Sequence, residues 1–117
     1  MSRRTQRVGE LLQAELAQLL VRSVQDPRIQ MTSIAAVDVS PDLRRAVVRI
    51  SVLDESQRQE SLAALRHAAG FLRRQLAHRL RHMRVTPELI FEIDRGAEHS
   101  QLISDLLERL DDNDKSA

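Results

Sequence analysis

Six arginines and three histidines lie between residues 61 and 87, and this stretch contains no acidic residue. Guanidinium groups bind phosphate oxygens through parallel hydrogen bonds, so arginines without counter-charges are typical of a surface that binds a polyanion. At about 100° per residue, most of these basic side chains fall opposite or beside an apolar helical stripe. The stretch therefore predicts a helical surface that binds phosphate.

Patterns for catalysis or metal binding are weak in comparison. His78 and His82 stand four residues apart, a helical spacing that can seat a metal ion, but no further ligands follow at a defined spacing. Asp54 and Glu55 fit the start of a helix, where carboxylates offset the helix dipole. The phosphate-loop pattern G-x-x-x-x-G-K and the nucleophile pattern G-x-S-x-G are absent from the sequence. We therefore expect no enzymatic activity, no metal site and no cofactor.

The net charge of +1 conceals an uneven distribution along the 117 residues. Residues 61–87 carry +6, from six arginines and no acid, whereas residues 88–117 carry −6, from nine acidic and three basic residues. The chain has no cysteine, no apolar run of membrane-spanning length and no signal-peptide pattern. We expect one soluble, cytoplasmic domain that is monomeric.

Hydrophobic periodicity predicts the elements that position the basic residues. Residues 3–24 form an amphipathic helix, and residues 35–39 and 45–52 form two strands of a hairpin with a turn at 40–44. Residues 62–84 form a helix pair that is broken at Gly70, residues 88–94 form a third strand, and a short helix follows around residues 103–110. We expect a domain over residues 1–110 and a disordered acidic tail over residues 111–117.

This order of elements is that of an α+β sandwich with helices on one face of a three-stranded sheet. Because a long helical crossover joins the second strand to the third, the sheet is expected to be mixed.

Gly70 and Phe71 each allow two interpretations. Gly70 costs about 1 kcal/mol relative to alanine inside a helix, so it indicates either close packing of the helices or the close approach of a phosphate. Phe71 lies off the apolar stripe, which allows it to stack on a base, although a break at Gly70 would return it to the core. Phe91 alternates with polar residues on a strand and is predicted to be core. With two aromatic residues in the chain, recognition of a nucleic acid should depend on its backbone charge and shape rather than on base stacking.

A series of short motifs resembles the ribosome-binding factor A family over roughly residues 4–110. In chain order the matching pieces are Arg4-x-x-Arg7-Val8, Glu15-Leu16, Asp26-Pro27-Arg28-Ile29, Val37-x-Val39-Ser40-x-Asp42-Leu43, Ala46-x-Val48, Leu65-x-x-Ala68-x-Gly70-x-Leu72-Arg73-x-x-Leu76, Arg84-x-x-Pro87-x-Leu89-x-Phe91-x-x-Asp94 and Ile103-x-x-Leu106-Leu107. No single piece is diagnostic, but their order and spacing together are specific.

The resemblance implies a type II KH-like fold (αββααβ) in which a kink at Ala68-Ala69-Gly70 replaces the usual Gly-x-x-Gly loop. It also implies binding to the free small (30S) ribosomal subunit and its 16S rRNA during late maturation, including processing of the 16S rRNA 5′ end, without catalysis by the protein itself. Small-subunit ribosomal proteins are further expected partners, since the acidic C-terminal region suits a basic protein.

The residues expected to contact RNA share positive charge or a bare backbone; they are Arg66, Gly70, Arg73, Arg74, His78, Arg81 and Arg84, with Arg3, Arg4 and Arg7 at the start of the chain. Arg79 points toward the apolar side and is expected to be ion-paired or to extend its charged end to solvent. The alternative function is a protein–protein adaptor whose basic helix binds an acidic partner.

Overall fold

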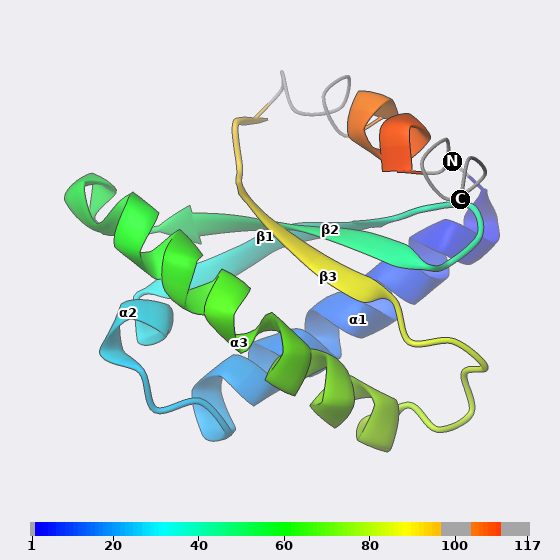
Figure 1. The fold of residues 1–117 in the computed structure, drawn as a ribbon, viewed down its shortest axis with the longest axis horizontal. Coiled ribbons are helices and arrows are strands. Elements are labelled where there is room, and N and C mark those ends of the chain that lie inside the picture. Colours follow the sequence, from blue (N-terminus) through cyan, green and yellow to red (C-terminus); the bar gives the residue numbers. More distant parts are fainter. Residues whose placement is uncertain (1, 97–103, 111–117) are drawn as a thin grey trace.

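The structure is a computed structural model of the chain, and it describes residues 2–96 and 104–110. The elements follow in the order α1 (Arg3–Arg22), α2 (Pro27–Gln30), β1 (Thr32–Val39), β2 (Arg45–Val52), η1 (Glu55–Gln57), α3 (Arg58–Arg79) and β3 (Glu88–Ile93), as Figure 1 shows. Residues 104–110 are helical, which agrees with the short C-terminal helix that we expect; the expected tail, residues 111–117, lies outside the described residues.

Within the described residues, β1, β2 and β3 form one sheet in that order. β1 pairs with β2 antiparallel and places Val37 opposite Val48, and β2 pairs with β3 parallel and places Val48 opposite Phe91. An antiparallel pair needs only a short turn, whereas a parallel pair needs a long crossover, which α3 supplies. The predicted mixed sheet is confirmed.

The two long helices pack on the same face of the sheet, α1 mainly against β1 and α3 mainly against β3. The core consists of fully buried side chains from the two helices and the sheet, among them Leu12, Leu16, Leu19, Ala46, Val48, Ile50, Leu65, Leu72, Leu76 and Phe91. Burial of this apolar surface is the main term that stabilises the fold. Phe91 is 1% exposed, so its predicted place in the core is confirmed.

The start of α1 lies unusually close to β1. Ser2 caps the helix, because its hydroxyl accepts a hydrogen bond from the Thr5 backbone N–H at 3.2 Å. One turn later, Gly9 is buried against the strand, and a Cβ added there would lie 2.5 Å from the carbonyl oxygen of Val37. Only a residue without a side chain allows this approach, so Gly9 fixes how the N-terminal half of α1 sits on the sheet.

Two predicted helix boundaries and the predicted break are corrected by the structure. α1 ends at Arg22 rather than at residue 24, and α3 runs through Gly70 as one helix rather than as two helices separated by a break. α3 also ends at Arg79, five residues before the predicted end, because Leu80 leaves the helical region at φ −114° and ψ 49°. Leu80 is buried and Met83 packs against the core from the loop, so apolar contacts continue after the helix has ended.

No helix among the described residues is long and apolar enough to cross a membrane. The same residues contain no cluster of three or more histidine, cysteine, aspartate or glutamate side chains that could hold a metal ion. His78 lies within α3 and His82 lies after its end, so this pair does not keep the helical spacing that the sequence suggested.

Candidate nucleic-acid interface

The exposed side of α3 carries two rows of basic residues that differ in their contacts. The first row, Arg66 and Arg73, reaches toward β3: Arg66 Nη2 donates to the Phe91 carbonyl at 3.1 Å, and Arg73 Nε donates to the Thr86 carbonyl at 3.1 Å. Arg66 also lies 3.5 Å from the Glu92 carboxylate. Arg66 ties α3 to the outer edge of the sheet, where backbone groups would otherwise lack partners, and Arg73 ties α3 to the loop that precedes β3.

The second row, which we call the open row, consists of His67, Gly70, Phe71, Arg74 and His78. All five residues are exposed and lie on one side of the helix, because steps of three or four positions join them and Gly70 and Phe71 are adjacent. No hydrogen bond or ion pair joins the Arg74 guanidinium to another residue in the part of the chain that the structure describes. The open row therefore presents the Arg74 guanidinium, two imidazoles, one aromatic ring and bare helix backbone to solvent.

Gly70 is not needed for packing within the molecule. A Cβ at this position would meet only Arg74 Nη1, at 3.5 Å, which is an ordinary contact with a flexible side chain. Of the two interpretations that the sequence allows, close packing of two helices is therefore wrong, because α3 is one helix and Gly70 faces solvent.

Arg79 and Arg81 are held by local contacts at the end of α3. Arg79 Nη1 lies 3.2 Å from Glu15 Oε2 and 3.3 Å from Gln18 Oε1, so it joins α3 to α1 and its predicted ion pair is confirmed. Arg81 Nε donates to the His78 carbonyl at 3.3 Å, near the negative end of the helix dipole. Arg81 remains exposed and can still offer charge to a partner.

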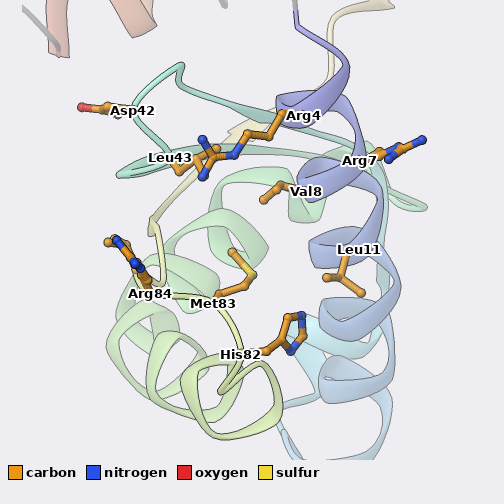
Figure 2. A pocket seen from close by; sticks show the side chains of 10 residues that line it. Arg4, Arg7, Val8, Leu11, Asp42, Leu43, His82, Met83 and Arg84 are labelled. Atoms are coloured by element: carbon orange, nitrogen blue, oxygen red, sulfur yellow. The ribbon is translucent and has the colours of Figure 1, made fainter.

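A groove of about 510 Å³ lies between α1, the β1–β2 turn and the loop after α3. This basic groove is lined by Arg4, Arg7, Val8, Leu11, Asp42, Leu43, His82, Met83, Arg84 and Val85. Figure 2 shows Arg4 extending toward Leu43, with Val8 and Met83 at the middle of the groove and Arg84 on its other side. The apolar floor and arginine rim suit an anionic partner that also has apolar surface.

Leu43 is held in an uncommon conformation at the rim of the groove. Its φ of 63° is the left-handed region, which costs a leucine about 1–2 kcal/mol. The turn maintains it through hydrogen bonds: the Ser40 carbonyl accepts from the Leu43 N–H at 2.9 Å, and the Ser40 hydroxyl accepts from the Arg45 N–H at 3.0 Å. In this backbone conformation, the Leu43 side chain packs against the core and also lines the groove.

Asp42 is the acidic residue in the described lining of this groove. Partial burial raises the pKa of Asp42. Hydrogen bonds from the Ser40 hydroxyl and the Arg44 backbone N–H, together with the charges of Arg44 and Arg45, lower it by more, so the pKa of Asp42 lies below its usual value. Asp42 is therefore ionised at neutral pH and offsets part of the positive charge of the rim.

A smaller hollow of about 210 Å³ links the basic groove to α3. It is lined by Arg44, Arg45, Arg73, Val85 and Glu88, and Val85 also lines the basic groove. Arg73 of the first row lines this hollow, so basic groups continue from Arg73 across it to Arg84 and Arg4. Arg45 lies 3.5 Å from Glu88, which offsets charge locally.

The structure thus brings together most, but not all, of the residues predicted to contact RNA. Arg4, Arg7 and Arg84 line one groove, Arg73 lines the hollow beside it, and Gly70, Arg74 and His78 share the open row. Arg66 is directed to the β3 edge, and Arg3 is exposed in the first turn of α1 without lining the groove.

The groove itself is not evident from the sequence. Helical and strand patterns do not mark Leu11, Leu43 and Val85 as part of a site, and Leu11, which the periodicity places on the buried stripe of the first helix, is 36% exposed. The one signal in the sequence is the apolar Leu43 within a turn rich in polar residues, where an aliphatic side chain needs a partner.

Comparison with known proteins places these features in a family. The family model described as ribosome-binding factor A matches residues 4–107. A protein of that name from Rhodopirellula baltica is 39% identical over 117 residues, covering 99% of this chain and 85% of the relative. Another from Lachnoclostridium phytofermentans is 48% identical over 103 residues, covering 86% of this chain and 75% of the relative.

Solved structures agree with the sequence matches. The crystal structure of ribosome-binding factor A from Thermus thermophilus matches with a TM-score of 0.67 at 29% identity, covering 76% of this chain and 94% of that one. Coordinates of the Thermus thermophilus protein fitted into the cryo-EM map of a 30S complex match with a TM-score of 0.63 at 29% identity, covering 79% of this chain and 97% of that one. The expected KH-like α+β fold is confirmed. The chain belongs to the ribosome-binding factor A family.

Proposed function

We propose that this protein binds the free small ribosomal subunit through its 16S rRNA and assists late maturation of the subunit in the cytoplasm. The observation that carries the proposal is the run of basic groups from Arg73 of α3, past Val85, to Arg84 and Arg4, with the exposed open row next to Arg73 on the same helix. Membership of the family supports it, as does the similarity to a protein that was fitted into a 30S complex.

The contacts with RNA are expected to be mainly to phosphates. Arg74, Arg81 and Arg84 supply exposed guanidinium groups, with His78 beside them and Arg4 and Arg7 across the groove. Gly70 lets a phosphate or ribose approach the helix backbone. Arg3 extends this surface, and Arg66 and Arg73 contribute charge while they hold α3 to the sheet. Such contacts fix position on a structured RNA without reading its sequence.

Processing of the 16S rRNA 5′ end would depend on RNA conformation that the protein holds, with cleavage by other enzymes. The expected result is that a variant unable to bind small subunits accumulates precursor 5′ ends in cells, as measured by primer extension. Normal 5′ ends in such cells would remove this part of the proposal.

Sedimentation with purified ribosomal particles tests the proposed partner. We expect the protein to sediment with free small subunits, to be released as salt increases because phosphate contacts weaken, and not to sediment with joined ribosomes. Competition by free 16S rRNA fragments separates this function from a protein–protein adaptor, which would bind its acidic partner undisturbed by the fragments. Equal binding to every RNA-containing particle would contradict the proposal.

Replacing Asp42 by asparagine should strengthen RNA binding. The Ser40 hydroxyl and the Arg44 N–H both donate to Asp42 Oδ1, at 2.6 and 3.0 Å, so an amide oxygen can keep the turn while the negative charge is removed. Because the pKa of Asp42 is lowered, the gain should be present at neutral pH and disappear as the pH falls through that pKa. We expect affinity to rise by about threefold at low salt.

The matched control for this variant is Glu60→Gln, which removes an exposed carboxylate from the first turn of α3. Binding isotherms for free small subunits should show no comparable gain for the control. An equal gain for both variants would indicate a general effect of net charge and no role for the groove.

A further inference from the structure

A second hollow, of about 820 Å³, lies beside the open row where α3 faces the segment between α1 and α2. It is lined by His67, Ala68 and Phe71 from α3 and by residues 23–28. Phe71 is 36% exposed, whereas Phe91 is 1% exposed. A single exposed apolar side chain does not by itself indicate a partner. The ring of Phe71, however, is part of the lining of a hollow that a ligand can enter.

Polar groups surround the ring of Phe71 at the rim of this hollow. Arg28 donates to both carboxylate oxygens of Asp26, from Nε at 3.0 Å and from Nη2 at 2.7 Å, which fixes the plane of its guanidinium. The charge of Asp26 is thereby neutralised within the pair. Hydrogen-bond donors and acceptors therefore surround the Phe71 ring. They come from the Arg28 guanidinium, the His67 imidazole, and the side chains of Ser23 and Gln25.

The neighbours of Phe71 on α3 suit a nucleic-acid backbone. Gly70 adjoins it and presents bare helix, and Arg74 follows one turn later with no partner among the described residues. A planar ring, a cation one turn away and a backbone without a side chain next to the ring match a base and its phosphate in size and charge.

We infer that this hollow takes one unpaired RNA base, stacked on Phe71, with its phosphate at Arg74; the inference rests on the proposed RNA-binding function. Stacking on an aromatic ring is tolerant of base identity and needs a strand that is not paired. An aliphatic side chain from a protein partner fits less well, because the lining offers three aliphatic residues, Val24, Pro27 and Ala68, beside five polar ones.

The chain contains no tryptophan and no tyrosine, so Phe71→Trp creates a single fluorophore in the hollow. Its fluorescence should fall by more than half when single-stranded oligoadenylate or free small subunits are added, because a stacked base quenches the indole. Leu53→Trp, at a position that is 85% exposed, serves as the control and should not change. Unchanged fluorescence of the Phe71→Trp variant when RNA is bound would overturn the inference.

Affinity measurements with two further variants identify the kind of contact. Phe71→Tyr keeps the ring and should bind oligoadenylate like the parent, whereas Phe71→Leu should bind about fivefold to a hundredfold more weakly. Binding to duplex RNA of the same length should not respond to either change. If leucine serves as well as tyrosine, the hollow binds an apolar side chain and not a base. If the parent binds no RNA at all, the proposed function itself fails.

Discussion

Replacing Arg74 and Arg84 together by glutamate is expected to reduce binding to free small subunits by on the order of a hundredfold while the fold is retained. Both residues are exposed, Arg74 in the open row of α3 and Arg84 on the rim of the basic groove. Each reversal removes a phosphate-binding cation and adds repulsion. The dependence of log K on log salt should become shallower by about 0.9 for each phosphate that is no longer neutralised.

Arg73 is left unchanged in this variant for a structural reason. Its guanidinium donates to the Thr86 carbonyl at 3.1 Å, so reversing its charge would disturb the loop that carries Val85 and confuse folding with binding. Lys115→Glu is the control: it also replaces one positive charge by one negative charge, but in the acidic C-terminal region of the sequence. Equal weakening by Lys115→Glu would mean that net charge, and not this surface, sets the affinity.

Replacing Gly9 by alanine is expected to destabilise the fold by about 1–3 kcal/mol. The new Cβ would lie 2.5 Å from the Val37 carbonyl oxygen, and since that atom is backbone in a paired strand, α1 must move away from β1. With no tryptophan or tyrosine in the chain, urea unfolding is followed by far-ultraviolet circular dichroism.

The same substitution at Gly70 is the matched control, and it should have the opposite sign. Gly70 lies within α3, its added Cβ would meet only the Arg74 side chain at 3.5 Å, and alanine favours a helix by about 1 kcal/mol over glycine. Gly70→Ala should therefore unfold at a higher urea concentration and yet bind small subunits less well, because its methyl group obstructs the backbone. A Gly9→Ala variant as stable as the parent would contradict the described approach of α1 to β1.

The order of the elements and the mixed sheet could be predicted because they depend on patterns in neighbouring residues. Alternation of valine, isoleucine and alanine around residues 45–52 marks a strand, and the helical crossover requires a parallel third strand. The ion pair of Arg79 followed from its place on the apolar side of a helix, where a charged group needs a partner.

The end and continuity of α3 could not be predicted from local signals. Leu80 and Met83 continue the apolar spacing, and the first residue that must stop a helix is Pro87, so the pattern extends the helix too far. The helix ends before Leu80, although neither glycine nor proline stands there. The Leu80 backbone leaves the helical conformation, and its side chain is buried in the core. Gly70 indicates a break because of its backbone cost, which a 22-residue helix packed on a sheet tolerates.

The division of the arginines into two rows with different contacts could not be predicted from the sequence either. Helical periodicity shows which way Arg66 and Arg73 point but not what they meet, and their acceptors lie 25 and 13 residues further along the chain. Gly9 gives no signal either, because its role depends on the approach to Val37 that only the folded chain creates.

Photo-cross-linking of the protein to free small subunits, followed by mass spectrometry of the RNA-linked peptides, tests the central claim most directly. We expect links from α3 between His67 and His78, from the loop around Arg84 and from the start of α1 near Arg4. We expect none from the opposite face of the sheet, where Arg49 is held by Asp38 at 2.8 Å. Links that arise mainly from that face, with the open row and the basic groove unmarked, would contradict the proposed RNA-binding surface.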